Sequence, residues 1–280
     1  MGDLERFRDK FRGCIIGQAL GDATGFVAEG CSTEECRRYV EEVLQGERGE
    51  MPRRPPFRFG QYSDDTQLAR ELTEGYAACG RLDPEDYALR IAAHFSEGRI
   101  VGRGRATSQA AGRLAGGVPW DEAGTPSPAA GNGSAMRAGP VGLFCYDDAD
   151  ALVRVAHDQG RITHGDSRCG AGAVAIAGAV ALAMGKEPVR PGRWLDLISE
   201  WARRIDPGFG DCVKDLLAWL PLAPEDALPL VRRAGLDDDY RASWQGISPF
   251  VVSSVLWRLY AFLKSPEDYW QSICTAIAAG

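Results

Sequence analysis

The chain has 280 residues, of which 45% are hydrophobic and 25% are charged, a composition typical of a soluble globular protein. Its 32 Lys and Arg residues against 39 Asp and Glu residues give a net charge of −7. Nucleic acids and membrane surfaces attract basic patches, so an acidic chain without a run of Lys or Arg argues against both as partners. The 34 glycines are about 12% of the chain, above the usual ~7%, and need a structural explanation.

The cysteines and the N-terminus indicate a reducing compartment. The eight cysteines form no Cys-x-x-Cys pair, and the charged segment from Met1 to Lys10 lacks the apolar part of a signal peptide. The longest apolar stretch, Gly170 to Gly185, has 16 residues, fewer than the ~20 that a membrane-spanning helix needs. We therefore expect a cytoplasmic protein with free thiols, no membrane association and a monomeric state.

The first predicted element is a helix from Leu4 to Leu20, because its apolar residues recur at spacings of three and four. A neighbouring stripe of this helix consists of glycines at every fourth position. Such a stripe predicts the close approach of another segment of the chain and would account for part of the glycine excess. The stripe comprises Gly13, Gly17 and Gly21.

Two loops and two helices follow. Residues 46–62, which include an unbroken Pro/Arg run, predict a long loop, and residues 116–134, rich in Gly, Pro and Ser, predict a second. Between them we expect a helix from about Asp65 to Cys79 and another that begins after Asp83 as its N-cap. Residues 99–109 are expected to form a loop.

The C-terminal half predicts further helices and no strands. The segment Gly170–Met184 is small or apolar on every side, which is typical of a central buried helix. No period-two alternation bounded by hairpin turns occurs, and no linker divides the chain, so the prediction is one all-α domain. The other predicted helices are Met136–Phe144, Asp148–Val155, 192–205, 211–219, 225–233, 250–263 and 266–278.

The most distinctive local motif is Ser63-Asp64-Asp65-Thr66, at the expected start of a helix. Ser and Asp are favoured caps, and negative charge there interacts well with the helix dipole, so one carboxylate has a structural explanation. Two adjacent carboxylates between two hydroxyls also provide four oxygen ligands within four residues, the donors that hard cations such as Mg²⁺ bind. Capping and metal binding are both open at this point.

Three further segments combine small residues with isolated polar groups. Asp22 and Glu29 follow the first helix within an apolar stretch, where a helix end and a solvated Glu are the simplest interpretation. The turn Gly131–Ser134 has backbone N–H groups that can bind phosphate before a helix, although it matches no known phosphate-binding fingerprint and also fits a plain turn. His164 precedes the small-residue helix, and a lone histidine there is usually structural.

In this order and spacing, these features resemble the ADP-ribosylglycohydrolase family. The stretch from Gly13 to Gly25 is similar to the family's opening helix, and residues 63–66 match its S/T-D-D-T metal motif. Residues 131–137 match its G-N-G-S/G-x-M-R loop, and Thr163-His164 matches its T-H segment. The resemblance covers essentially the whole chain and implies an all-α, compact, orthogonal helix bundle in a single domain over residues 1–280.

The resemblance implies a metal-dependent hydrolase that removes ADP-ribose from a protein side chain or a small molecule by cleaving the bond at the anomeric carbon of the ribose. The cofactor would be Mg²⁺ or Mn²⁺ in a two-metal site. Ser63, Asp64 and Asp65 would ligate metal, and the catalytic carboxylate would be one of Glu29, Asp64 and Asp65. The ADP-ribose-binding residues would be Gly131, Asn132, Gly133, Ser134 and His164.

The family also carries a second metal motif, D-x-D-T, after an apolar helix. That helix is recognisable here from Asp268 to Gly280, but no Asp-x-Asp-Thr occurs in the sequence, and Asp237-Asp238-Asp239 is interpreted as a solvated turn. We therefore expect an incomplete second metal site in a trimmed form of a hydrolase. The alternatives are a non-catalytic ADP-ribose-binding relative and a phosphoesterase based on Asp64-Asp65. The acceptor is not determined by the sequence; the loops 46–62 and 99–109 are expected to border the site.

Overall fold

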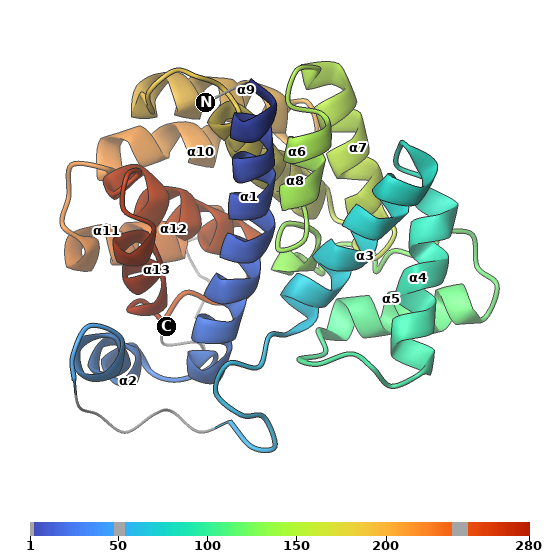
Figure 1. The fold of residues 1–280 in the computed structure, drawn as a ribbon, viewed down its shortest axis with the longest axis horizontal. Coiled ribbons are helices and arrows are strands. Elements are labelled where there is room, and N and C mark those ends of the chain that lie inside the picture. The colour runs from blue at the N-terminus through green and yellow to red at the C-terminus, as the bar shows by residue number, and fades with distance from the viewer. Residues whose placement is uncertain (1–2, 48–53, 237–245) are drawn as a thin grey trace.

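The computed structural model describes residues 3–47, 54–236 and 246–280. Residues 48–53 and Asp237–Asp239, which the sequence predicts as part of a loop and as a solvated turn, lie outside the described residues. Within these ranges the chain consists of helices and loops with isolated β-bridges and no sheet, so the predicted all-α fold is confirmed (Figure 1). The helices are α1 (Asp3–Gly25), α2 (Thr33–Arg38), α3 (Asp64–Cys79), α4 (Pro84–Ser96), α5 (Arg105–Ala115), α6 (Gly139–Phe144), α7 (Ala149–Arg161), α8 (Ser167–Ala183), α9 (Pro191–Arg203), α10 (Pro207–Trp219), α11 (Pro224–Arg233), α12 (Val251–Lys264) and α13 (Tyr269–Ile277).

Side-chain caps explain why several helix starts could be predicted. The Asp83 carboxylate accepts hydrogen bonds from the backbone N–H groups of Glu85 and Asp86 at the start of α4. Ser63 caps α3 and Asp148 caps α7 in the same way. Each cap satisfies N–H groups that have no partner inside the helix, and this local chemistry is visible in the sequence.

The structure differs from the prediction in two segments. The short helix α2 continues directly into a π-helical turn at Tyr39–Leu44, and a capping box between Ser32 and Glu35 begins it. Helix α5 begins at Arg105, inside the segment 99–109 that was predicted as a loop. The buried residues of α5 are small ones such as Ala110 and Ala111, so the helix lacks the large apolar residues on which the sequence pattern depends.

Helix α8 is the buried central helix that its composition predicts, and it packs against α6, α7, α9 and α12. Its glycines make this packing close. A Cβ atom on Gly172 would lie 2.5 Å from Val251 Cγ2, and one on Gly178 would lie 2.9 Å from Trp201 Cε3. Such distances exclude a larger side chain at either position, and they explain part of the glycine excess.

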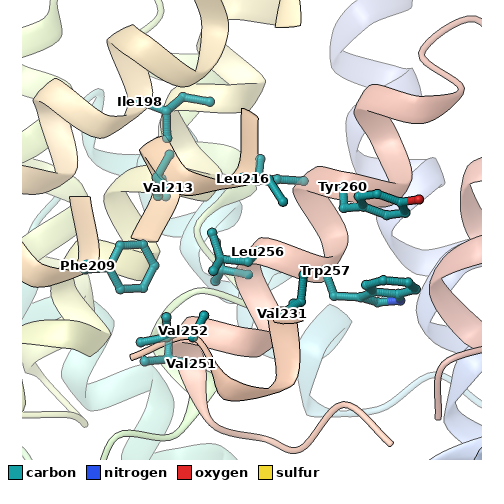
Figure 2. Close-up of a cluster of buried hydrophobic side chains, with 14 of the residues drawn as sticks. Ile198, Phe209, Val213, Leu216, Val231, Val251, Val252, Leu256, Trp257 and Tyr260 are labelled. Atoms are coloured by element: carbon teal, nitrogen blue, oxygen red, sulfur yellow. The ribbon is translucent and has the colours of Figure 1, made fainter. Parts of the chain in front are cut away.

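A large apolar cluster joins α8 to the C-terminal helices, and none of the side chains named here is more than 1% exposed. Figure 2 shows side chains from α9, α10, α11 and α12 directed toward one another. Burial of such side chains is the main stabilising contribution in a helical domain. They include Ile198, Phe209, Val213, Leu216, Val231 and Leu256.

The glycine stripe of α1 faces α13. The predicted close approach of another segment is confirmed for two of the three glycines. A Cβ on Gly17 would lie 3.4 Å from the Tyr269 ring, and one on Gly21 would lie 3.0 Å from Ile273 Cδ1. The Tyr269 hydroxyl also donates a hydrogen bond of 2.7 Å to the carbonyl oxygen of Gly17. Gly13 faces open space, so the prediction is wrong at that position.

In the ranges that the structure describes, no helix combines the length and the apolar character needed to cross a bilayer.

Candidate functional site

A cavity of about 680 Å³ follows one face of α1 and is closed on the other side by α12 and α13. Much of its wall is apolar, from residues such as Leu143, Val180 and Ile273. The polar side chains that line it include five of the predicted site residues. Among the polar lining residues are Lys10, Asp22, Glu29, Ser63, Asp64, Asp65, Asn132, Ser254 and Arg258.

Asp22, near the end of α1, connects that helix to the start of α3. Its carboxylate accepts two hydrogen bonds of 2.8 Å from the N–H and hydroxyl groups of Ser63. It accepts two more, of 3.1 and 2.6 Å, from the N–H and hydroxyl groups of Thr66. Sequence reasoning left Asp22 outside the candidate residues; an isolated carboxylate within a small, apolar stretch was the signal that could have found it.

Asp64 and Asp65 are the first two residues of α3, and they differ in exposure. Asp64 is 5% exposed, while Asp65 is half-buried and open to the cavity. The loop that follows α4 covers Asp64. Its Gly102 has a φ of +77°, and a Cβ there would lie 3.1 Å from Asp64 Oδ1, so both the backbone conformation and the space require glycine.

Asp22, Glu29, Asp64 and Asp65 form an acidic wall of the cavity, and its negative charges raise the pKa of Asp64 and Asp65. Burial is the largest cause for both Asp64 and Asp65, and the neighbouring carboxylates add to it. The pKa of Asp64 lies well above its ordinary range. The pKa of Asp65 rises to about 7, although the charge of Arg258 lowers it. Such crowding of carboxylates is relieved by a nearby positive charge.

The donor chemistry of this wall fits a hard divalent cation. Ser63, Asp64 and Asp65 offer only oxygen ligands, and Mg²⁺ or Mn²⁺ bind one or two carboxylates together with several waters. The Ser63 hydroxyl donates to Asp22, and its oxygen accepts a long hydrogen bond of 3.4 Å from the Asp65 N–H group, so one lone pair remains to act as a ligand. Across the described ranges, no group of three or more His, Cys, Asp or Glu side chains is placed together as a ligand set.

Glu29 lies at the exposed edge of the cavity, with about half of its side chain accessible (52%). The guanidinium group of Arg54 donates hydrogen bonds to Glu29 Oε2, at 2.5 Å, and to the carbonyl oxygen of Phe26, at 2.7 Å. It also lies over the Phe26 ring at 4.1 Å. The Pro/Arg loop therefore reaches the candidate catalytic carboxylate, as its predicted position at the border of the site requires.

Residues Gly131–Ser134 form the glycine loop, which the protein holds from two sides. Asn132 donates through its N–H to the Pro249 carbonyl oxygen at 2.9 Å and through Nδ2 to Ser254 Oγ at 3.0 Å. Ser134 is fully buried, and its hydroxyl donates to the Cys169 carbonyl oxygen at 2.7 Å. Asn132 lines the cavity, and the side chain of Ser134 is directed into the protein.

His164 lies directly behind the glycine loop and is buried. A Cβ on Gly133 would lie 2.6 Å from His164 Cε1, so this glycine is required for the contact. The Nδ1 atom of His164 shares a hydrogen bond of 2.8 Å with the Thr163 hydroxyl. Burial, with a smaller effect of the Arg137 charge, lowers the pKa of His164 to about 3, so the ring is neutral at physiological pH.

Arg137 is fully buried beneath this loop and completes a polar network. It donates to the side-chain and carbonyl oxygens of Gln159 at 2.9 and 2.8 Å and to the Thr163 hydroxyl at 2.8 Å. Its Nη1 atom is buried and has no hydrogen-bond partner among the described residues. Gly131, Gly133, Ser134 and His164 do not line the cavity themselves, so the network positions the loop from behind.

Comparisons with known proteins identify a family and several relatives that this chain is similar to. A family model described as ADP-ribosylglycohydrolase matches residues 3–280. An uncharacterized protein from Archaeoglobus fulgidus is 35% identical over 62% of this chain and 55% of its own length. The ADP-ribosylarginine hydrolase Tri1 from Pseudomonas putida is 31% identical over 57% of this chain and 43% of its own length.

Two further similarities extend the comparison. The ADP-ribosylhydrolase ARH3 from Xenopus tropicalis is 28% identical over 70% of this chain and 56% of its own length. A solved structure titled "ADP-ribosylglycohydrolase-related protein complex" superimposes with a TM-score of 0.68 and 24% identity, covering 99% of this chain and 82% of that one, which shows a shared fold. The chain spans about half the length of the curated relatives that it matches.

Proposed function

The chain belongs to the ADP-ribosylglycohydrolase family, and on that premise we propose that it hydrolyses the bond between ADP-ribose and an acceptor at the anomeric carbon of the ribose. The observation that carries the proposal is the shared cavity. The carboxylates Asp64 and Asp65 and the glycine-loop residue Asn132 line the same space of about 680 Å³. Binding pockets for small molecules commonly have this size and a largely apolar lining with few polar groups.

The residues of this cavity suit the chemistry. Hydrolysis adds a water oxygen to the anomeric carbon, and the acceptor leaves with a proton, through a transition state with oxocarbenium character. Carboxylates next to that carbon stabilise the developing positive charge. Asp64, Asp65 and Glu29 are the candidates by position, and the glycine loop would hold the ADP-ribose away from bulk water.

The proposal includes a divalent cation, Mg²⁺ or Mn²⁺. Ser63, Asp64 and Asp65 would hold it, and Asp22 keeps Ser63 in place through its two hydrogen bonds. A cation bound there would supply charge that orients the ribose hydroxyls and acidifies a water. The chain's own contribution is to fix the oxygen ligands at the start of α3, where the helix dipole tolerates two negative charges.

An activity assay with two substrates tests the function. ADP-ribosylated arginine and ADP-ribosylated serine peptides are incubated with the protein and Mg²⁺ or Mn²⁺, and free ADP-ribose is measured. We expect release from at least one substrate, a loss of about 100-fold or more in Asp64→Asn and Asp65→Asn, and no change in Asp9→Asn, an exposed α1 carboxylate outside the cavity.

The other outcomes separate the alternatives. If ADP-ribose binds but neither peptide is cleaved, the chain is an ADP-ribose-binding relative. If AMP is released in place of ADP-ribose, because the diphosphate is hydrolysed and phosphoribose stays on the peptide, the phosphoesterase alternative is correct. The monomeric state and the cytoplasmic location stay predictions, and the comparison of the two peptides identifies the acceptor.

A further inference from the structure

Arg258, on α12, is a cation in the cavity to which the proposed function assigns no role. Its side chain is exposed and lines the cavity. Its Nη1 atom donates hydrogen bonds to the carbonyl oxygen and hydroxyl of Ser254, at 3.0 and 2.9 Å, and its other donors have no partner among the described residues. Lys10, the other cation of the described lining, is already bound to the carbonyl oxygens of Ala183 and Gly185.

The anchor of Arg258 is shared with the glycine loop. Ser254 Oγ accepts one hydrogen bond from Arg258 Nη1 and another, of 3.0 Å, from Asn132 Nδ2. Ser254 is 1% exposed, so the anchor is fixed by packing. A ligand that contacts Asn132 therefore lies next to the guanidinium group of Arg258. One edge of this group is held by Ser254, and its remaining N–H groups are free to donate hydrogen bonds.

The charges around the cavity define what Arg258 can bind. The acidic wall repels any anion that enters, and a phosphate next to it needs a compensating positive charge. Arg258 is close enough to this wall for its charge to act on Asp65. A planar guanidinium group donates paired hydrogen bonds to phosphate oxygens, and it remains charged at every physiological pH.

We propose that Arg258 is a substrate-binding residue that contacts phosphate oxygens of the ADP-ribose diphosphate, on the wall of the cavity formed by α12. This inference rests on the proposed function, because it takes ADP-ribose as the ligand. Arg258 would thus act together with the glycine loop, although it comes from a distant part of the chain. Its charge would favour a nucleoside diphosphate over an uncharged nucleoside.

Isothermal titration with ADP-ribose in EDTA-containing buffer tests the inference without metal or turnover. The variants are Arg258→Ala, Arg258→Lys and the control Arg154→Ala, an exposed α7 arginine outside the cavity. We expect Arg258→Ala to weaken ADP-ribose binding by about 10- to 100-fold, Arg258→Lys to retain a large part of the affinity, and Arg154→Ala to bind like the wild type. The salt dependence of binding should decrease in Arg258→Ala because one charge contact is lost.

The remaining outcomes overturn the inference in distinguishable ways. Equal ADP-ribose affinity in the wild type and Arg258→Ala overturns the role of Arg258 and leaves the proposed function intact. A loss of affinity with unchanged salt dependence, or an equal loss in Arg258→Lys, indicates a structural role and also overturns it. If the wild type does not bind ADP-ribose in EDTA, the titration is repeated with Mg²⁺ in place of EDTA. Absence of binding under both conditions overturns both the inference and the proposed function.

Discussion

The glycine loop and the acidic wall contribute to the same cavity, but the protein stabilises them in opposite ways. Polar groups of the glycine loop and its support have partners within the chain: Asn132 bonds to Pro249 and Ser254, and Ser134 bonds to Cys169. In the acidic wall, Asp64 and Asp65 are crowded by like charges that raise the pKa of each. In the first region the loop's side chains and backbone are bonded within the chain, with the buried Nη1 of Arg137 as an exception, and the second region carries excess negative charge.

This difference shows that one part of a binding site can be preformed while another part is stabilised only when a ligand binds. Internal hydrogen bonds give the glycine loop one geometry before any ligand arrives, so little conformational entropy is lost on binding. The acidic wall has the opposite property, because its charge repulsion is reduced when a cation binds. We therefore expect the loop to control the stability of the protein and the acidic wall to control its response to ligands.

The largest expected effect comes from Arg137→Ala, beneath the glycine loop. The substitution leaves a cavity and removes the donors that Gln159 and Thr163 now accept from. We expect a loss of about 3 kcal/mol or more in the free energy of unfolding, measured by urea denaturation. The exposed Arg154→Ala should change it by less than about 0.5 kcal/mol. Similar effects of the two substitutions would contradict the view that the network supports the fold.

The second prediction concerns metal binding at the acidic wall and its effect on the free energy of unfolding. We expect Mg²⁺ or Mn²⁺ to stabilise the wild type by about 2.7 kcal/mol when the free metal is at 100 times its Kd, because a ligand that binds only the folded state shifts the unfolding equilibrium. Asp65→Asn should lose this increase, and Asp9→Asn should retain it. Thermal unfolding with and without metal measures both, and an equal shift in Asp65→Asn would place the metal elsewhere.

Gly133→Ala tests the contact between the glycine loop and His164. The added Cβ would lie 2.6 Å from His164 Cε1 and 3.2 Å from Thr107 Oγ1, so the loop or the ring has to move. We expect a loss of about 2 kcal/mol in the free energy of unfolding. The control is Gly112→Ala on α5, where a Cβ meets nothing within 4 Å. It should stabilise the protein by about 0.5–1 kcal/mol, because alanine favours the helix.

The last prediction concerns pH, where the expected effect is smallest per pH unit. Burial lowers the pKa of His164 to about 3, while in the unfolded chain it lies near 6.5. The unfolded state therefore binds a proton first as the pH falls, and the stability that His164 contributes is present above about pH 6.5 and is lost toward pH 3. The expected slope is up to about 1.4 kcal/mol per pH unit. His164→Gln should have a flatter profile in urea denaturation between pH 6.5 and 4; parallel profiles would show that His164 takes up its proton while folded.

Local signals account for the parts of the fold that were predicted. The caps Ser63, Asp83 and Asp148 each act within three residues, so the starts of α3, α4 and α7 follow from short sequence patterns. The small residues of α8 indicate a buried helix because no other environment suits them. Helix α5 was missed since its buried face consists of small residues without apolar periodicity.

The sequence by itself determined the helical class, the helix caps, the family resemblance and the acidic motif at residues 63–66. Only the tertiary structure decided which groups meet there. Asp22 reaches Ser63 across 41 positions, and Asn132 reaches Ser254 across 122. Caps and periodicity depend on neighbours within one or two helical turns, whereas such pairings depend on how whole helices pack. For that reason Asp22 and Arg258 were recognised in the structure and not in the sequence.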